Sequence, residues 1–390
     1  MPLIAALPLI WLATAAAALE VRAAVIRIDS TLPLPISRLD LPPDDLGLTG
    51  AALATEDNAT TGRFTGTTYD TRSVAVAPEA APAALEALRA DGVALIVVLG
   101  DAAVTLALAD AAGPGALVLN AGAADERLRE ADCRANMLHV APSRMMLSDA
   151  LVQFLIWKKW PRILMIAGSH PGDRLLAEAY RRSAAKFGAK LVEEREFTDT
   201  GGARRTDSGH VQVQRQIPVF TQGAPDHDVI VAVDEADVFA AHLPYRNWDA
   251  RPVTGSAGLM PVSWHAAHEA WGATQFQRRF ERLAGRPMRA EDYQVWLALR
   301  VIGEAVTRTG SADPAVIRDY VLSEAFELAA FKGQKVTFRP WNGQLRQPIL
   351  LSDRHVTVSV SPQEGYLHQG SELDTLGPDR PETACTAFGG

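Results

Sequence analysis

Cysteine is scarce in this sequence: Cys133 and Cys385 are the only two among 390 residues. Two thiols are too few for a metal cage built from cysteine. In an oxidising compartment, a pair of cysteines favours one disulfide, which would tie the C-terminal tail to the body of the chain. Two unrelated free thiols fit the sequence as well, because cysteine pairing cannot be deduced from position alone.

Clustered positive charge is also lacking. The 38 Lys and Arg residues are outnumbered by 46 Asp and Glu residues, which gives a formal net charge of −8. The basic pairs that occur, Lys158-Lys159 and Arg204-Arg205, are short and fit a solvated surface. Because binding to phosphate backbones depends on clustered Lys and Arg, the composition excludes nucleic acid as a general partner.

Complete catalytic motifs are absent. Residues 233–237 match the acidic motif of nucleic-acid ATPases, but no glycine-lysine phosphate loop accompanies them. The sequence has no Gly-x-Ser-x-Gly elbow, and residues 113–115 read as a turn rather than a dinucleotide loop. With no nucleophile, base and orienting residue as a set, the sequence predicts neither an enzyme nor a cofactor.

Only one long apolar run occurs, at the N-terminus, and no Lys or Arg precedes it. Its apolar core leads into small residues, which fits a secretory signal over residues 1–24 better than a spanning helix. Removal after Ala17, Ala18 or Ala23 satisfies the pattern equally, and a buried N-terminal helix is the alternative interpretation. The signal predicts a protein exported from the cytoplasm, and no second apolar run is long enough to anchor it in a membrane.

Apolar runs alternate with helical patterns through the chain. Continuous apolar strands separated by helices are typical of parallel sheets covered on both faces. The pattern occurs twice and therefore predicts an α/β protein with two lobes and a cleft between them. Strands are expected at 25–28, 94–99, 116–119, 162–167, 190–196, 229–233, 336–338 and 356–360; helices at 49–58, 83–90, 103–111, 149–159, 174–187, 275–284 and 293–307; and an irregular polar loop at 198–209.

Five segments carry a family resemblance: residues 50–58 with Gly62, and residues 97–101, 139–143, 163–180 and 338–343. With them, the chain resembles type I periplasmic binding proteins, the branched-chain amino-acid receptor class of ABC importers. The resemblance implies a hinged, monomeric receptor for a small-molecule ligand, with an ABC permease in the inner membrane as partner. It implies a first lobe of residues 25–141 and 262–325, a second lobe of 142–261 and 326–360, and a tail of 361–390.

A narrower resemblance rests on five further segments, residues 243–246, 263–272, 331–334, 344–348 and 359–365. They are similar to the subgroup associated with bacterial PQQ-dependent alcohol oxidation, whose transported ligand the resemblance does not supply. A periplasmic ligand sensor without a transporter would use the same residues, and a periplasmic enzyme is the remaining alternative.

Polar side chains follow several of the expected strands. Because ligands of open α/β sheets lie at the carboxyl ends of the strands, these residues are the candidate ligand-binding set. Asp101 and Asp234 have an alternative role, since Asp commonly caps the helix that follows a strand. The set consists of Gly100, Asp101, Asn120, Ser169, His170, Asp234 and Glu235.

The resemblance also sets a limit on the ligand. Amino-acid receptors of the class place Ser or Thr hydroxyls after the third and fourth strands, where this chain has Asp101 and Asn120. His170 stands where the second lobe of those receptors supplies an aromatic contact. A carboxylate at Asp101 would repel the carboxylate of an amino acid, so the sequence argues against amino-acid specificity.

One further cluster combines Trp264, His265, His268, Glu269 and Trp271. The two indoles could form a ligand platform, which adds Trp264 and His265 to the candidate set. Two imidazoles make an incomplete metal site, and the zinc-protease spacing is absent. The alternative is an ordinary helix start whose Trp side chains pack into the lobe, and no metal site is predicted.

Overall fold

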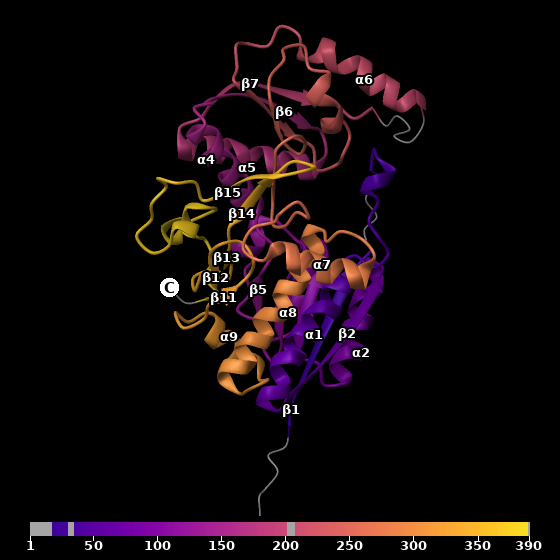
Figure 1. Ribbon diagram of the computed structural model, residues 1–390, viewed down its shortest axis with the longest axis vertical. Coiled ribbons are helices and arrows are strands. Elements are labelled where there is room, and N and C mark those ends of the chain that lie inside the picture. The colour runs from indigo at the N-terminus through magenta and orange to yellow at the C-terminus, as the bar shows by residue number, and fades with distance from the viewer. Residues whose placement is uncertain (1–17, 30–34, 201–206, 389–390) are drawn as a thin grey trace, which may run out of the picture.

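The computed structural model describes residues 18–29, 35–200 and 207–388, which form two lobes stacked along the long axis (Figure 1). The first lobe is built on a five-stranded parallel sheet of order β2-β1-β3-β4-β5. Its strands β3 and β4 are buried at every position, as expected of strands covered on both faces. The strands are β1 (Leu19–Ile28), β2 (Thr67–Val76), β3 (Leu95–Leu99), β4 (Leu117–Asn120) and β5 (Met137–His139).

Helices cover both faces of this sheet. Successive side chains of a strand point to opposite faces, so Val25 and Val97 enter one core while Ile26 and Val98 enter the other. The first core also contains side chains of α1 (Leu48–Thr65), α7 (Ala273–Ala284), α8 (Ala290–Thr309) and α9 (Pro314–Val321). The second contains side chains of α2 (Ala81–Ala90) and α3 (Ala102–Ala112).

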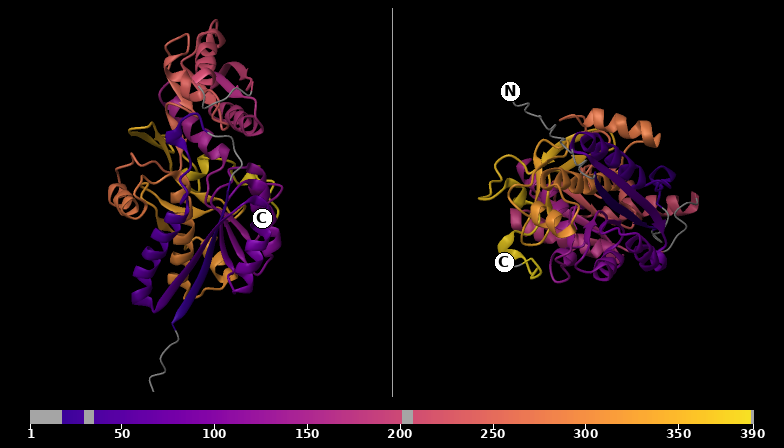
Figure 2. Two further views of the ribbon diagram at one scale, coloured as in Figure 1. Left: turned by 90° about the vertical axis from the view of Figure 1, so that its right-hand side faces the viewer. Right: turned by 90° about the horizontal axis from the view of Figure 1, so that it is seen from below.

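The second lobe repeats the plan with a four-stranded parallel sheet of order β7-β6-β8-β9. One face packs against α4 and α5, and the other against α6 and the short helix η4. Figure 2 shows this lobe above the first from the side, and the molecule from below. The elements are α4 (Arg144–Trp157), β6 (Arg162–Gly168), α5 (Pro171–Phe187), β7 (Lys190–Phe197), α6 (Asp207–Thr221), β8 (Val229–Val233), η4 (Ala240–Tyr245) and β9 (Val253–Gly255).

A small antiparallel sheet joins the lobes. It has the order β10-β14-β15, with β10 (Met260–Val262), β14 (Ile349–Ser352) and β15 (Thr357–Ser361). Leu351 packs in the core of the second lobe and Leu350 in that of the first, so the two faces of β14 serve different lobes.

The chain crosses between the lobes three times. The first connection is residues 140–143 between β5 and α4, and the second is residues 263–272 between β10 and α7. The third is residues 347–348, which precede β14. Two-lobed proteins bend at such connections when they close around a ligand.

The structure confirms the predicted α/β fold with two parallel sheets. It differs at residues 326–345, which the sequence analysis places in the second lobe. Phe338 and Leu345 of this segment lie in the apolar core of the first lobe, because β11 (Leu328–Ala329), β12 (Lys335–Phe338) and β13 (Leu345–Arg346) pack there. The pattern also missed β2, whose exposed side chains alternate with partly buried ones.

The N-terminal boundary also differs from the expectation. The predicted signal runs to residue 24, yet β1 begins at Leu19, and Val21, Ala23 and Ala24 are buried in it. Residues 1–17 lie outside the described residues, as do residues 201–206 of the predicted polar loop. Among the described residues, no helix combines the length and the apolar character that crossing a bilayer requires.

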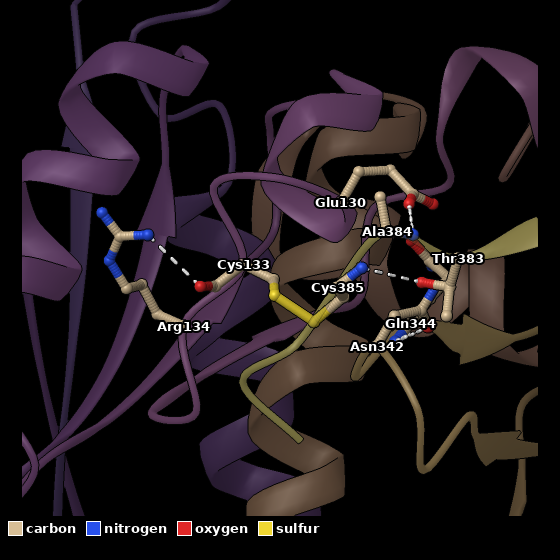
Figure 3. The surroundings of a disulfide bond; sticks show 8 residues. All are labelled: Glu130, Cys133, Arg134, Asn342, Gln344, Thr383, Ala384 and Cys385. Atoms are coloured by element: carbon tan, nitrogen blue, oxygen red, sulfur yellow. Dashed lines mark hydrogen bonds between the residues drawn. A yellow bond between two sulfur atoms is a disulfide. The ribbon is translucent and has the colours of Figure 1, made fainter. Parts of the chain in front are cut away.

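The C-terminal tail lies across both lobes. Within the second lobe, the Asp149 carboxylate accepts hydrogen bonds from the tail N–H of Gly377 and from Lys186, each at 2.7 Å. Further along, Cys385 is joined to Cys133 of the first lobe, with 2.09 Å between the sulfur atoms (Figure 3). The Cα atoms of the pair are 5.7 Å apart, within the usual range for a disulfide.

Candidate functional site

The two lobes meet through Arg144, the first residue of α4. Its Nε donates to Glu235 Oε1 at 2.8 Å and its Nη2 to Glu235 Oε2 at 2.9 Å. Its Nη1 lies 3.0 Å from Asp125 Oδ2. Asp125 follows β4 of the first sheet and Glu235 follows β8 of the second, so the carboxyl ends of both sheets converge on one guanidinium.

Electrostatics keep this guanidinium charged. Burial alone would lower the pKa of Arg144, but the Glu235 and Asp125 carboxylates outweigh burial and raise it. Bidentate arginine-carboxylate pairs also fix geometry, because two parallel N–H bonds leave little freedom to rotate. Arg144 therefore sets the relative positions of the two sheet ends.

A second polar contact joins the lobes at the loop between β1 and α1. The Ile36 N–H donates to Asp237 Oδ2 at 2.7 Å. Ile36 belongs to the first lobe and Asp237 follows β8 of the second. Figure 1 shows the short helix η1 (Arg38–Asp40), in indigo, rising from the first lobe toward the second.

Asp173 positions Glu235 from inside the second lobe. This fully buried carboxylate accepts the backbone N–H of Glu235 at 2.7 Å and that of His170 at 3.0 Å. It thereby links the start of α5 to the loop after β8. The sequence analysis missed Asp173, although an acidic residue at the third position of a helix is a capping signal.

The predicted residues of the first lobe have structural roles. Asp101 Oδ1 accepts the N–H groups of Ala103 at 2.8 Å and Val104 at 3.0 Å, which is the capping alternative. A Cβ atom at Gly100 would lie 2.6 Å from a side-chain carbon of Ile28, so this glycine permits close packing.

Asn120 is fully buried and hydrogen-bonds within its own turn. Its Oδ1 accepts the N–H groups of Gly122 at 3.1 Å and Ala123 at 2.8 Å, and its Nδ2 donates to the Ala123 carbonyl at 2.8 Å. Nδ2 also lies 3.2 Å from Nδ1 of the buried His139. Asn120 therefore shapes the turn that leads to Asp125.

Most of the predicted residues of the second lobe also have structural roles. Asp234 is buried and accepts the N–H groups of Val238, Phe239 and Ala240, so it caps the segment that leads into η4. Burial raises the pKa of Asp234. Ser169 and His170 both contact Asp199, through the Asp199 N–H at 3.1 Å and its carboxylate at 2.8 Å. Of the predicted residues, Glu235 alone lies in the Arg144 contact between the lobes.

The tryptophan and histidine cluster divides between core and surface, because Trp264 and His268 are buried whereas Trp271 is 56% exposed. Trp264 is buried and stacks on Tyr293, with 4.8 Å between ring centroids. His265 Nδ1 accepts the Ala267 N–H at 3.1 Å, while His268 Nε2 lies 3.0 Å from the Phe331 carbonyl oxygen. In the part of the chain that the structure describes, no three His, Cys, Asp or Glu side chains are grouped to hold a metal.

A surface pocket of about 830 Å³ opens between β7 and α6. Its walls include Phe197, Arg215, Val219 and Phe220, all from the second lobe. A ligand in this pocket would contact one lobe and could not hold the two lobes together. The contact between the lobes at Arg144 is therefore the candidate site.

Sequence reasoning missed Arg144 and Asp125. One signal was available for Arg144, because an arginine in the first turn of a helix opposes the helix dipole and needs a carboxylate partner. Nothing in the sequence identifies Asp125 as that partner, since 19 positions separate the two residues and the fold alone brings them together.

Residues 47–207 match the model of a family described as periplasmic binding protein. A periplasmic binding protein from Burkholderia mallei is 13% identical, with coverage of 95% of this chain and 99% of that chain and a TM-score of 0.67. An amino acid ABC transporter substrate-binding protein from Pseudomonas fluorescens Pf-5 is 13% identical, with coverage of 95% of this chain and 100% of that chain and a TM-score of 0.69.

An ABC transporter solute-binding protein from R. palustris in complex with benzoate is 11% identical, with coverage of 94% of this chain and 99% of that chain and a TM-score of 0.64. A search of curated protein sequences finds no match. The chain has the fold of the type I periplasmic binding proteins. These structures are described as binding proteins, and two of the three as components of ABC transporters.

Proposed function

We propose that this chain is the periplasmic solute-binding component of an ABC importer, and that its ligand binds between the lobes beside Arg144. The observation that carries the proposal is the guanidinium held by Asp125 of one lobe and Glu235 of the other. This contact supports the proposal because a small molecule beside it would meet the carboxyl ends of both sheets at once. The chain acts as a monomer that delivers its ligand to an inner-membrane permease.

Binding between the lobes explains how occupancy becomes a signal. A ligand that contacts both lobes binds the closed form more tightly than the open form and so shifts an existing equilibrium toward closure. The three connections between the lobes supply the hinge for this motion. The permease would then recognise the closed shape.

The ligand class follows in part from Asp101. Among the similar structures, one relative is described with benzoate and another as an amino acid transporter component. In this chain the first amides of α3 already bond the Asp101 carboxylate. A ligand carboxylate at that helix start would have to displace Asp101, which argues against an amino acid held there by its carboxylate.

The link to PQQ-dependent alcohol oxidation rests on sequence segments alone. Three of them contain residues of the junction between the lobes, namely Ser263, Lys332 and Gln347. The link predicts that the ligand retained by the protein changes when the producing cells grow on an alcohol. Mass spectrometry of protein from both cultures tests it, and the same ligand pattern in both would contradict it.

The test of the binding function is recovery of the ligand. Native mass spectrometry of gently purified protein should detect one small molecule per chain, which rebinds after removal by unfolding. The variant Glu235→Gln should lose affinity, since it weakens the contact to Arg144. Its matched control is Glu193→Gln, because Glu193 also pairs with an arginine of the second lobe and has the same 33% side-chain exposure.

The control should retain native affinity. Equal affinity in both variants would move the site away from Arg144. Complete absence of a retained small molecule would contradict the binding function itself.

A further inference from the structure

Two buried side chains, Lys332 and Gln347, join all three connections between the lobes. The Lys332 ammonium donates to the Ser263 carbonyl of the second connection at 3.1 Å and to Gln347 Oε1 of the third at 2.6 Å. Gln347 Nε2 donates in turn to the Val140 carbonyl of the first connection at 2.7 Å. One chain of hydrogen bonds therefore runs from connection to connection.

These bonds lie entirely in the interior. Lys332 is 1% exposed and Gln347 is not exposed at all. The ammonium also lies 4.9 Å from the centroid of the Tyr293 ring, within the range of a cation–π interaction. Among the described residues, Lys332 takes part in no ion pair, and both of its hydrogen-bond acceptors are neutral oxygens.

Because these groups are buried, breaking the hydrogen bonds that Lys332 makes with Ser263 and Gln347 would cost free energy. A buried polar group that loses its hydrogen-bond partner costs free energy, and a buried ammonium costs more than a neutral group. Any motion that pulls Ser263 or Gln347 away from Lys332 would take one of these two hydrogen-bond partners from the buried ammonium. Motions that keep the three connections together avoid this cost.

A second set of contacts reinforces the connections. Gln344 Nε2 donates to the carbonyls of His139 and Ala141, each at 3.2 Å, and Gln344 Oε1 accepts from Arg129 Nε at 2.7 Å. Arg129 also donates to the Ala141 carbonyl at 2.8 Å. Gln344 and Arg129 therefore hold the first connection against neighbouring parts of the first lobe, while the pairing of β10 with β14 holds the strands that flank the second and third connections. The hydrogen bonds through Lys332 and Gln347 link all three connections to one another.

We propose that Lys332 and Gln347 form a clasp that fixes the hinge axis, so that the lobes rotate about one set of joined connections and do not slide past one another. The proposal rests on the proposed function, because it concerns the closing motion of a two-lobed receptor. Lys332 and Gln347 are positioning residues, and the ligand need not touch either of them.

The test measures the interlobe distance in ligand-free protein. Spin labels attached through genetically encoded reactive residues at Phe64 and Tyr245, which are 90% and 95% exposed, report on the first and second lobes. This labelling leaves the single disulfide intact. Double electron–electron resonance then gives the distribution of distances between the lobes.

Two clasp variants are compared with a matched control. Lys332→Met removes the ammonium, and Gln347→Glu is nearly isosteric but removes the donor to the Val140 carbonyl. The control is Asn58→Ala, because Asn58 is 4% exposed and its Nδ2 donates to the Leu299 carbonyl at 2.9 Å within the first lobe. All three substitutions remove a buried side-chain hydrogen bond to the backbone.

Both clasp variants should widen the distance distribution relative to the native protein, whereas Asn58→Ala should lower the melting temperature and leave the distribution unchanged. If Lys332→Met does not fold, Gln347→Glu decides the outcome. A native distribution in Gln347→Glu, or the same widening in Asn58→Ala, would overturn the proposal. Because no ligand is added, failure to find a ligand would leave this result standing.

Discussion

Asp101 Oδ1 accepts the backbone N–H of Ala103 at 2.8 Å and so caps α3 at the end of the first sheet that faces the second lobe. Asp101→Ala should lower the free energy of unfolding by about 1 kcal/mol, because the first turn of the helix loses its acceptor. Asp101→Asn should cost much less, since an Asn side chain also caps. Denaturant unfolding of both variants checks this, and equal losses would show that the charge matters more than the cap.

If the predicted signal is removed on export, the mature chain should retain Leu19. Residues 19–22 of β1 pair with β2 from Thr67 onward, so removal after Ala23 would leave that part of β2 without its neighbour. Removal after Ala17 or Ala18 keeps the whole strand. Mass spectrometry of the exported chain should therefore find a first residue at Ala18 or Leu19, and a first residue at Ala24 would contradict this reading.

Loss of the Cys133–Cys385 disulfide should lower stability. The two residues are 252 positions apart, and closing so long a loop restricts the unfolded chain. The chain-entropy model gives up to about 5 kcal/mol for a loop of this length. Non-reducing peptide mapping should recover the linked pair, and the double variant Cys133→Ser, Cys385→Ser should melt at a lower temperature. An unchanged melting temperature would mean that the tail is held by its other contacts.

Lys332 should make stability depend on pH. Burial lowers its pKa well below the usual lysine value of about 10.4. Between the lowered pKa and the usual one, the unfolded chain binds more protons than the folded chain, so the free energy of unfolding rises with pH. The rise ends above the usual pKa, where Lys332 is neutral in both the folded and the unfolded chain. The Lys332→Met variant has no ammonium at this position and should not show the rise.

The measurement is urea unfolding of the native protein and Lys332→Met across the alkaline range. The native free energy of unfolding minus that of the variant should increase as the pH rises. A constant difference would mean that Lys332 titrates alike in the folded and unfolded chains.

The sequence predicted the fold better than the site. Apolar runs such as residues 94–99 identify buried strands directly, because a strand covered on both faces needs apolar side chains at every position. The β2 strand was missed because it lies at the edge of its sheet with half its side chains in solvent. Local patterns report burial, and an edge strand is only partly buried.

The candidate site was harder to predict from the sequence, because it is formed by residues that lie far apart in the chain. Asp101, Asn120 and Asp234 do lie at the carboxyl ends of strands, as the rule for open sheets requires, but each hydrogen-bonds to backbone N–H groups nearby. Whether such a side chain caps the next helix or turn or instead faces a ligand depends on the path of the loop that follows the strand. The contact of Arg144 with Glu235 spans 91 positions, and only the folded chain brings the two together.

The most direct test of ligand binding between the lobes is small-angle X-ray scattering of the ligand-free protein before and after its retained ligand is restored. Closure around a ligand at Arg144 should reduce the radius of gyration of native protein and of the Glu193→Gln control. Glu235→Gln should require more ligand for the same reduction. Stoichiometric rebinding with no change in the radius of gyration would contradict the account.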